Sequence, residues 1–162
     1  MLATLTGDIT KHEAEVLVNT VNRVGVMGRG VALDMKTAFP EIMPAYEAAC
    51  RSRREDAFPY FHKLQHGPQA GRYVAMVATK RHWRNPSTIE DVSAQIDALY
   101  ALCKRQGVTT IAIPPLGCGL GGLRWTDVRP LIAAKFEADP EITAYVLPLE
   151  AHTSQRRPGE RA

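Results

Sequence analysis

Five apolar stretches rich in β-branched residues alternate with more polar segments along the chain. Short apolar runs that are bounded by turn residues are typical of buried strands. The pattern therefore predicts strands at 2–5, 16–21, 73–78, 110–113 and 143–149.

The segments between these strands show helical periodicity. After a capping box at 86–90, an apolar stripe predicts a helix that ends near Gly107 and is formed by Val92, Ile96, Leu99 and Cys103. A helix from Thr126, which tolerates Pro130 early, would bury Val128, Leu131, Ile132 and Phe136. Residues 29–39 and 40–50 predict two more helices, separated at Pro40. Strands that alternate with helices indicate an α/β fold with a sheet between helices.

Composition indicates one domain. The chain has 162 residues, of which 45% are hydrophobic and 23% charged, which is enough apolar material for one core. We expect this domain to cover 1–150 and a basic, flexible tail or truncated linker to follow at 151–162, where apolar periodicity is absent. Without a long apolar run or a leader at its start, the chain is expected to be a cytoplasmic monomer that does not contact membranes.

Cysteines and charge narrow the chemistry further. The three cysteines, Cys50, Cys103 and Cys118, lie far apart and match neither a disulfide framework nor a zinc motif, so we expect no metal site. The net charge is +3, and basic residues gather at 51–54, 80–84 and 156–161. On charge alone, an anionic partner and an ordinary solvated face both remain open.

Two glycine-rich loops each connect a predicted strand to a predicted helix, at 22–32 and 114–123. Glycine reaches positive φ and has no Cβ, so successive backbone N–H groups can converge on an anion at a helix N-terminus. Two such loops suit a diphosphate, although each could also be a tight turn. Gly117, Gly119 and Gly122 fit the GxGxxG pattern but lie too late in the chain for a dinucleotide-binding fold, and a P-loop lysine is absent.

Four segments together resemble the macrodomain family: Gly7-Asp8-Ile9-Thr10, Val18-Asn19-Thr20-Val21-Asn22 and the two loops. The resemblance implies a mixed central β-sheet sandwiched between α-helices, with an ADP-ribose cleft and no cofactor. Asp8 would accept a hydrogen bond from the adenine amino group, Ile9 would donate its backbone N–H, and Asn22 would face the distal ribose. The first loop would contribute Gly28, Gly30 and Val31, and the second Gly117, Cys118, Gly119, Leu120, Gly121, Gly122 and Leu123. Asp8 could equally be a helix cap.

Residues 77–84 are similar to the subgroup that contains the terminal ADP-ribose protein glycohydrolase and, more closely, the bacterial antitoxins of the DarG type. The resemblance implies that Lys80 is catalytic, that the substrate is ADP-ribose attached to thymidine in single-stranded DNA, and that a DarT-like toxin is the partner. The protein glycohydrolase has an aspartate where this chain has Gly121, so the second carboxylate of that mechanism is missing here.

The chemistry at Lys80 has two alternatives. As a neutral amine it could attack C1″ of the opened distal ribose, which requires a pKa lowered by burial or by Arg81 and Arg84. As an ammonium it could protonate or polarise the leaving thymine. The mixture of cations and rings at Arg81, His82, Trp83 and Arg84 suits an unpaired DNA strand, unless Trp83 packs into the core.

Three other functions compete with DNA de-ADP-ribosylation. The chain could remove ADP-ribose from glutamate in proteins or hydrolyse O-acetyl-ADP-ribose. It could instead be a reader that binds ADP-ribose without turning it over. A module that only binds nucleic acid would explain the basic residues but not the paired glycine loops.

Overall fold

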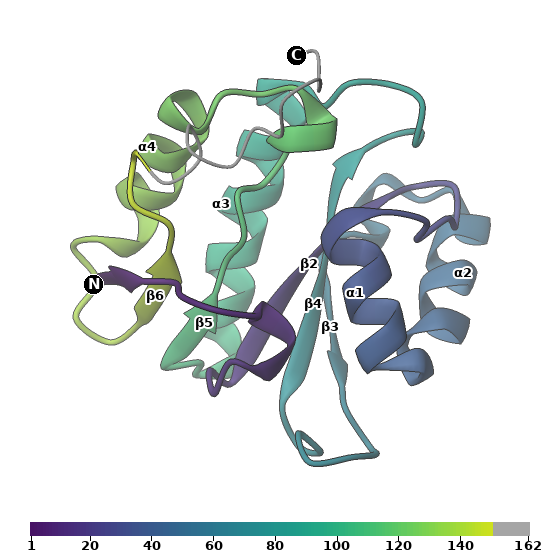
Figure 1. The fold of residues 1–162 in the computed structure, drawn as a ribbon, viewed down its shortest axis with the longest axis horizontal. Helices are drawn as coiled ribbons and strands as arrows, with labels where there is room; N and C mark the ends of the chain where they lie inside the picture. The colour runs from purple at the N-terminus through teal and green to yellow at the C-terminus, as the bar shows by residue number, and fades with distance from the viewer. Residues whose placement is uncertain (151–162) are drawn as a thin grey trace.

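The computed structural model describes residues 1–150 and contains one six-stranded sheet in the order β1-β6-β5-β2-β4-β3 (Figure 1). The strands are β1 (Leu2–Thr4), β2 (Val16–Asn22), β3 (Tyr60–Lys63), β4 (Tyr73–Lys80), β5 (Thr110–Ala112) and β6 (Thr143–Val146). Only β3 runs antiparallel to its neighbour, and the other pairings are parallel. The predicted tail at 151–162 lies outside the described residues.

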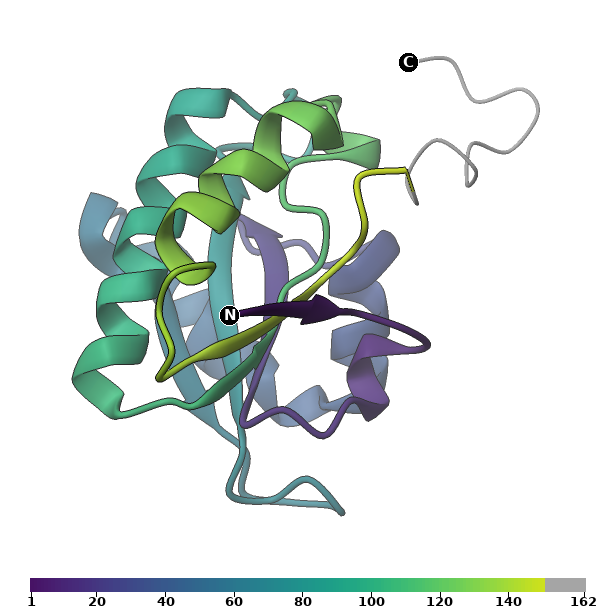
Figure 2. The ribbon, with the colours of Figure 1, turned by 90° about the vertical axis from the view of Figure 1, so that its left-hand side faces the viewer.

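Helices cover both faces of the sheet, which confirms the predicted α/β sandwich (Figures 1 and 2). They are α1 (Gly30–Ala38), α2 (Met43–Ser52), α3 (Ile89–Gln106) and α4 (Trp125–Phe136). The α1 and α2 side has its own buried cluster, which includes Met35 and Tyr46. The α3 and α4 side has another, which includes Leu99 and Ile132. No helix within residues 1–150 is long and apolar enough to cross a membrane.

Differences from the predicted elements have local causes. β3 was not predicted, because this short edge strand directly follows Pro59 and lacks a long apolar run. Residues 40–50 are not one helix, because a 3₁₀ turn at Pro40–Ile42 precedes α2. Helix α4 begins one residue earlier than expected, and Leu131 is only partly buried.

The end of α3 at Gly107 agrees with the sequence, whereas its start lies one residue later than the capping box at 86–90 indicates, because Thr88 and not Ser87 is the N-cap. The side chain of Thr88 accepts a hydrogen bond from the backbone N–H of Asp91 (3.2 Å), which satisfies a first-turn donor. Gly107 ends the helix in the left-handed conformation, with φ of 67°. The start of α3 is thus fixed, and with it the loop that connects it to β4.

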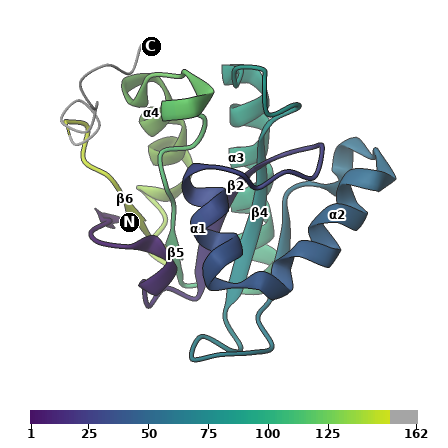
Figure 3. The same cartoon turned by 45° about the vertical axis from the view of Figure 1, so that its right-hand side comes forward.

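Three adjacent strands, β5, β2 and β4, direct their carboxyl ends to the same edge of the sheet because they are parallel. The first glycine loop follows β2, the second follows β5, and Lys80 ends β4. In Figure 3 the segments after β2 and β5 both reach this upper edge. The topology therefore gathers the three predicted site segments in one place.

Candidate functional site

Lys80 lies opposite Asn22 across the β2–β4 pair, at the point where the strand register changes. Val21 pairs with Ala78 and Asn22 with Lys80, so Thr79 has no partner residue on β2. Such a bulge interrupts the alternation of side chains and redirects those beyond it. Nζ of Lys80 donates hydrogen bonds to the carbonyl of Leu120 (3.0 Å) in the second loop and, more weakly, to that of Trp83 (3.5 Å).

Partial burial lowers the pKa of Lys80 below its usual value. Arg81 is not the cause, because its guanidinium is paired with Glu55 (2.7 Å) and Asp91 (3.1 Å), which offset its charge. No carboxylate of the described residues forms an ion pair with Lys80. Of the causes proposed from the sequence, burial is the one that operates.

The first loop is held by the amide of Asn22. Its Nδ2 donates to the carbonyl of Val26 (2.8 Å), and its Oδ1 accepts from the backbone N–H of Val24 (3.0 Å) and the hydroxyl of Tyr46 (2.9 Å). Asn22 is buried, so in this structure its side chain stabilises the loop instead of projecting from it. The loop leads through Gly28 to Gly30, whose φ is 58°, and Val31 in the first turn of α1. First-turn N–H groups have no partners within the helix and can bind an anion.

The second loop turns on glycines in the left-handed region. Gly117, Gly119 and Gly122 have φ of 72°, 64° and 82°. The loop closes on itself where the N–H of Leu123 donates to the carbonyl of Gly117 (3.0 Å). Cys118 and Leu123 also form an isolated parallel β-bridge through their backbones. The N–H groups of Cys118, Gly121 and Gly122 also donate to carbonyls of this loop, so those of Gly119 and Leu120 are the ones that can bind a phosphate. Burial raises the pKa of the Cys118 thiol to about 12, so Cys118 is not an activated nucleophile.

The two loops and Lys80 approach one another closely. A Cβ added to Gly30 would lie 3.7 Å from Cδ1 of Leu120, so the tip of the second loop covers the start of α1. A Cβ added to Gly121 would lie 3.9 Å from Cε of Lys80. The structure thus brings together the glycine loops and the lysine that the sequence singled out.

Asp8 and Ile9 lie in the segment after β1, where Asp8 caps a 3₁₀ turn at Ile9–Lys11. Oδ1 of Asp8 accepts from the backbone N–H (2.9 Å) and the hydroxyl (2.8 Å) of Thr10, and these bonds lower the pKa of the carboxyl group. Asp8 therefore acts as a helix cap through Oδ1, while its Oδ2 can accept a hydrogen bond from another donor. Asp8 also borders an open cavity of about 570 Å³, together with His12 and Tyr145.

The segment after Lys80 presents aromatic and cationic groups to solvent. The Trp83 side chain is 48% exposed, so the alternative that it packs into the core is wrong. The guanidinium of Arg84 lies over the indole, 4.6 Å from the ring centroid, and the His82 ring is 5.4 Å away. Such a surface can stack an unpaired base, whereas Arg81 contacts carboxylates in this structure.

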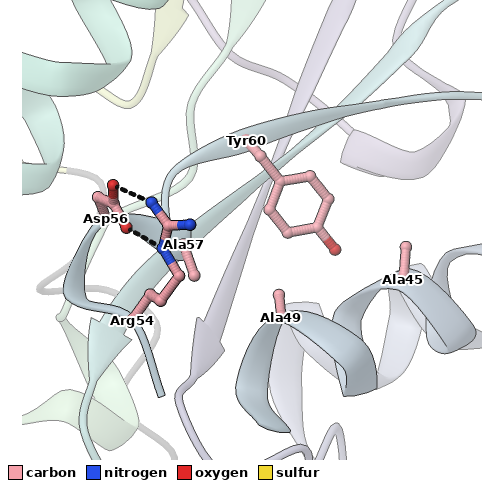
Figure 4. Close-up of a pocket in the computed structure, with 6 residues that line it drawn as sticks. All are labelled: Ala45, Ala49, Arg54, Asp56, Ala57 and Tyr60. Atoms are coloured by element: carbon pink, nitrogen blue, oxygen red, sulfur yellow. Dashed lines mark hydrogen bonds and ion pairs between the residues drawn. The ribbon is translucent and has the colours of Figure 1, made fainter. Parts of the chain in front are cut away.

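A pocket elsewhere does not involve the predicted site. It measures about 390 Å³ and is lined by Ala45, Ala49, Arg54, Asp56, Ala57 and Tyr60 (Figure 4). Arg54 is paired with Asp56 at its rim (2.8 Å), which neutralises part of the basic cluster at 51–54.

Sequence reasoning missed residues that act through contacts between distant segments. Tyr46 of α2 anchors Asn22, Glu55 neutralises Arg81, and the buried Ser87 lies against the second loop. The pattern around Tyr46 predicts only that a helix buries it in the core, and the position of Ser87 before a helix predicts only that it caps that helix.

Comparison with known proteins agrees with this geometry. The family model described as Macro domain matches residues 18–132. A DNA ADP-ribosyl glycohydrolase of Mycobacterium tuberculosis is 38% identical over 88% of this chain and 40% of its own length. One from Thermus aquaticus is 41% identical over 90% of this chain and 41% of its own length. A DNA ADP-ribosyl transferase-DNA ADP-ribosyl glycohydrolase fusion protein of Thermosipho africanus is 32% identical over 92% of this chain and 42% of its own length.

Among solved structures, the macrodomain of Mycobacterium tuberculosis DarG superposes with a TM-score of 0.84 at 35% identity, over 91% of this chain and 97% of that one. The chain thus spans about two fifths of the curated relatives and nearly all of the solved macrodomain. Fold, loop geometry and sequence lead to the same conclusion: the chain belongs to the macrodomain family.

Proposed function

We propose that this chain removes ADP-ribose from thymidine in single-stranded DNA and acts as the antitoxin of a DarT-like DNA ADP-ribosyltransferase. The observation that carries the proposal is Lys80 between the glycine loops, with Gly121 where the protein glycohydrolase has a carboxylate. The names of the relatives support the substrate, and the fusion of transferase and glycohydrolase in one relative supports the toxin partner.

ADP-ribose would be held by backbone groups and by Asp8. The N–H groups of Gly119 and Leu120 in the second loop and those of the first turn of α1 would contact the phosphates. The free Oδ2 of Asp8 would accept from the adenine amino group. The surface formed by His82, Trp83 and Arg84 would stack and contact the strand that carries the modified thymidine. As a monomer, the chain would provide all these groups itself.

Lys80 would act as an amine, since burial lowers its pKa and no described carboxylate pairs with it. The C1″–O4″ bond of the distal ribose would open first, with its electron pair going to O4″, which takes a proton from solvent, and C1″ left doubly bonded to the thymine nitrogen. The Lys80 nitrogen would then add to C1″. The bond from C1″ to thymine would break with its electron pair going to the base, which takes a proton from the Lys80 nitrogen. Water would then cleave the C1″–Lys80 bond and release ADP-ribose.

The test is release of ADP-ribose from an oligonucleotide that carries ADP-ribosyl-thymidine. Lys80→Ala should abolish release but retain binding of free ADP-ribose, because the loops bind mainly through their backbone. Lys63→Ala is the matched control, since Lys63 is an exposed lysine at the end of β3. Full activity in Lys80→Ala would refute the catalytic role of Lys80. If the unaltered chain binds free ADP-ribose but releases none from the oligonucleotide, the chain is a reader of ADP-ribose and not a hydrolase.

A further inference from the structure

Ser87 carries a buried hydroxyl without a hydrogen-bond partner. The residue is 6% exposed, and its Oγ has no partner in the described structure. A buried hydroxyl left unpaired is costly, so its presence calls for a physical explanation. Ser87 lies in the loop between Lys80 and α3, directly before the capping residue Thr88.

The hydroxyl occupies the space beside Gly121. A Cβ added to Gly121 would lie 2.5 Å from Oγ of Ser87 and 3.1 Å from its Cβ. The first distance is shorter than atoms tolerate and the second is tight, so residue 121 can carry no side chain unless Ser87 moves. The backbone N–H of Ser87 also donates to the carbonyl of Gly121 (2.9 Å), which fixes the two segments relative to each other.

Glycine at 121 is required for its lack of a side chain and not for its backbone conformation. Gly117, Gly119 and Gly122 in the same loop have positive φ, whereas Gly121 does not. The nearest other side chain to the excluded position is Lys80, whose Cε lies 3.9 Å away. Ser87 therefore determines what can stand next to Lys80.

We propose that Ser87 is a positioning residue for Lys80. Its side chain keeps position 121 free of any side chain and leaves Lys80 as the ionisable group at that place. Its backbone N–H, which donates to the carbonyl of Gly121, holds the loop whose Leu120 carbonyl accepts from Lys80. A role of Ser87 in catalysis rests on the proposed function, in which Lys80 is catalytic. The steric contact between Ser87 and position 121 does not depend on that function.

A series of variants tests the steric coupling. Gly121→Ala should weaken binding of free ADP-ribose about tenfold, because overpacking displaces the loop. The same change should cost less with Ser87→Ala, which removes Oγ, and least with Ser87→Gly, which also removes the Cβ. The midpoint of thermal unfolding, measured on the same variants, should follow the same order. An equal effect of Gly121→Ala in all three backgrounds would overturn the proposal.

Gly119→Ala is the matched control. Gly119 lies in the same loop at φ of 64°, and nothing lies within 4 Å of its added Cβ. Its substitution strains the backbone whatever residue stands at 87, so its effect should be the same in the three backgrounds. Dependence of the Gly119→Ala effect on residue 87 would show a general weakening of the loop instead of the specific contact.

A second readout concerns the charge of Lys80. Combining Ser87→Gly with Gly121→Asp should place a carboxylate next to the amine and raise the pH at which Lys80 becomes reactive by about one unit. Acylation of Lys80 by an amine reagent, followed against pH by peptide mass spectrometry, measures this without any DNA substrate. Gly121→Asp alone should raise that pH less, because Ser87 keeps the new carboxylate away from Lys80. An equal pH for Gly121→Asp with and without Ser87→Gly would contradict the proposal.

The two proposals can fail separately. If the unaltered chain releases no ADP-ribose from DNA, the proposed function fails, while the unfolding series and the acylation profile still decide the role of Ser87. If those two measurements show no coupling while DNA is processed, the inference on Ser87 fails alone.

Discussion

Lys80 experiences two opposing influences on its charge. Partial burial lowers its pKa, whereas the carbonyls of Leu120 and Trp83 accept hydrogen bonds that the ammonium form can donate. Arg81 contributes little repulsion because Glu55 and Asp91 surround its guanidinium. Desolvation is the influence that prevails: it lowers the pKa of Lys80 and so favours the neutral amine.

The pH dependence of the reaction follows from this shift. An amine nucleophile is active when deprotonated, so release of ADP-ribose should increase with pH and level off below the pH of about 10.4 at which a free lysine loses its proton. Initial rates between about pH 6 and 10 measure this, with the Lys63→Ala variant expected to give the same profile. A rate that falls as pH rises through this range would instead identify Lys80 as an ammonium acid.

The first loop depends on a helix on one face of the sheet. Tyr46 is fully buried in α2, and its hydroxyl shares its one proton between the carbonyl (2.8 Å) and Oδ1 (2.9 Å) of Asn22. Asn22 in turn holds Val24 and Val26. The conformation of the first loop thus depends on α2 through one side chain, the amide of Asn22.

Tyr46→Phe should loosen this loop. It removes the hydroxyl with little change in volume, leaves the Asn22 oxygens short of a donor and should cost about 1 kcal/mol of unfolding free energy. ADP-ribose affinity should fall several-fold, measured by calorimetry beside denaturant unfolding. Tyr100→Phe removes a hydroxyl that bonds to Asp139 and serves as the control for stability. Unchanged affinity in Tyr46→Phe would show that the loop does not depend on α2.

The elements differ in how far the sequence predicts them. Long apolar runs predicted β2 and β4, and paired capping signals predicted α3, because these patterns report burial and local backbone preference. β3 was missed because a short edge strand is defined by its pairing with β4. Glycine spacing located both loops, and family resemblance singled out Lys80. The contacts of Ser87 and Tyr46 could not be foreseen, since each joins segments far apart in the chain.

Across the whole molecule, charge is more compensated than composition indicates. Arg54 pairs with Asp56, and Arg81 with Glu55 and Asp91, so two of the three basic clusters are partly neutralised. Trp83 and Arg84 remain available next to Lys80. Recognition of a DNA strand should therefore rely on stacking more than on the net charge of +3.

Trp83→Ala should separate DNA recognition from ADP-ribose binding. Loss of a stacked base is worth about 1–3 kcal/mol, so the KM for the modified oligonucleotide should rise about tenfold, while affinity for free ADP-ribose stays unchanged. Trp83→Phe keeps an aromatic face and should recover most of the difference. An equal loss of affinity for free ADP-ribose and for the oligonucleotide would place Trp83 in the ADP-ribose site instead.

The central claim is that the substrate is modified DNA, and one comparison tests it most directly. The unaltered chain is incubated, side by side, with thymidine-ADP-ribosylated single-stranded DNA and with glutamate-ADP-ribosylated protein, and the initial rates of ADP-ribose release are compared. We predict rapid release from the DNA and slow release from the protein, because Gly121 provides no second carboxylate beside Lys80. Faster release from the protein than from the DNA would contradict the account.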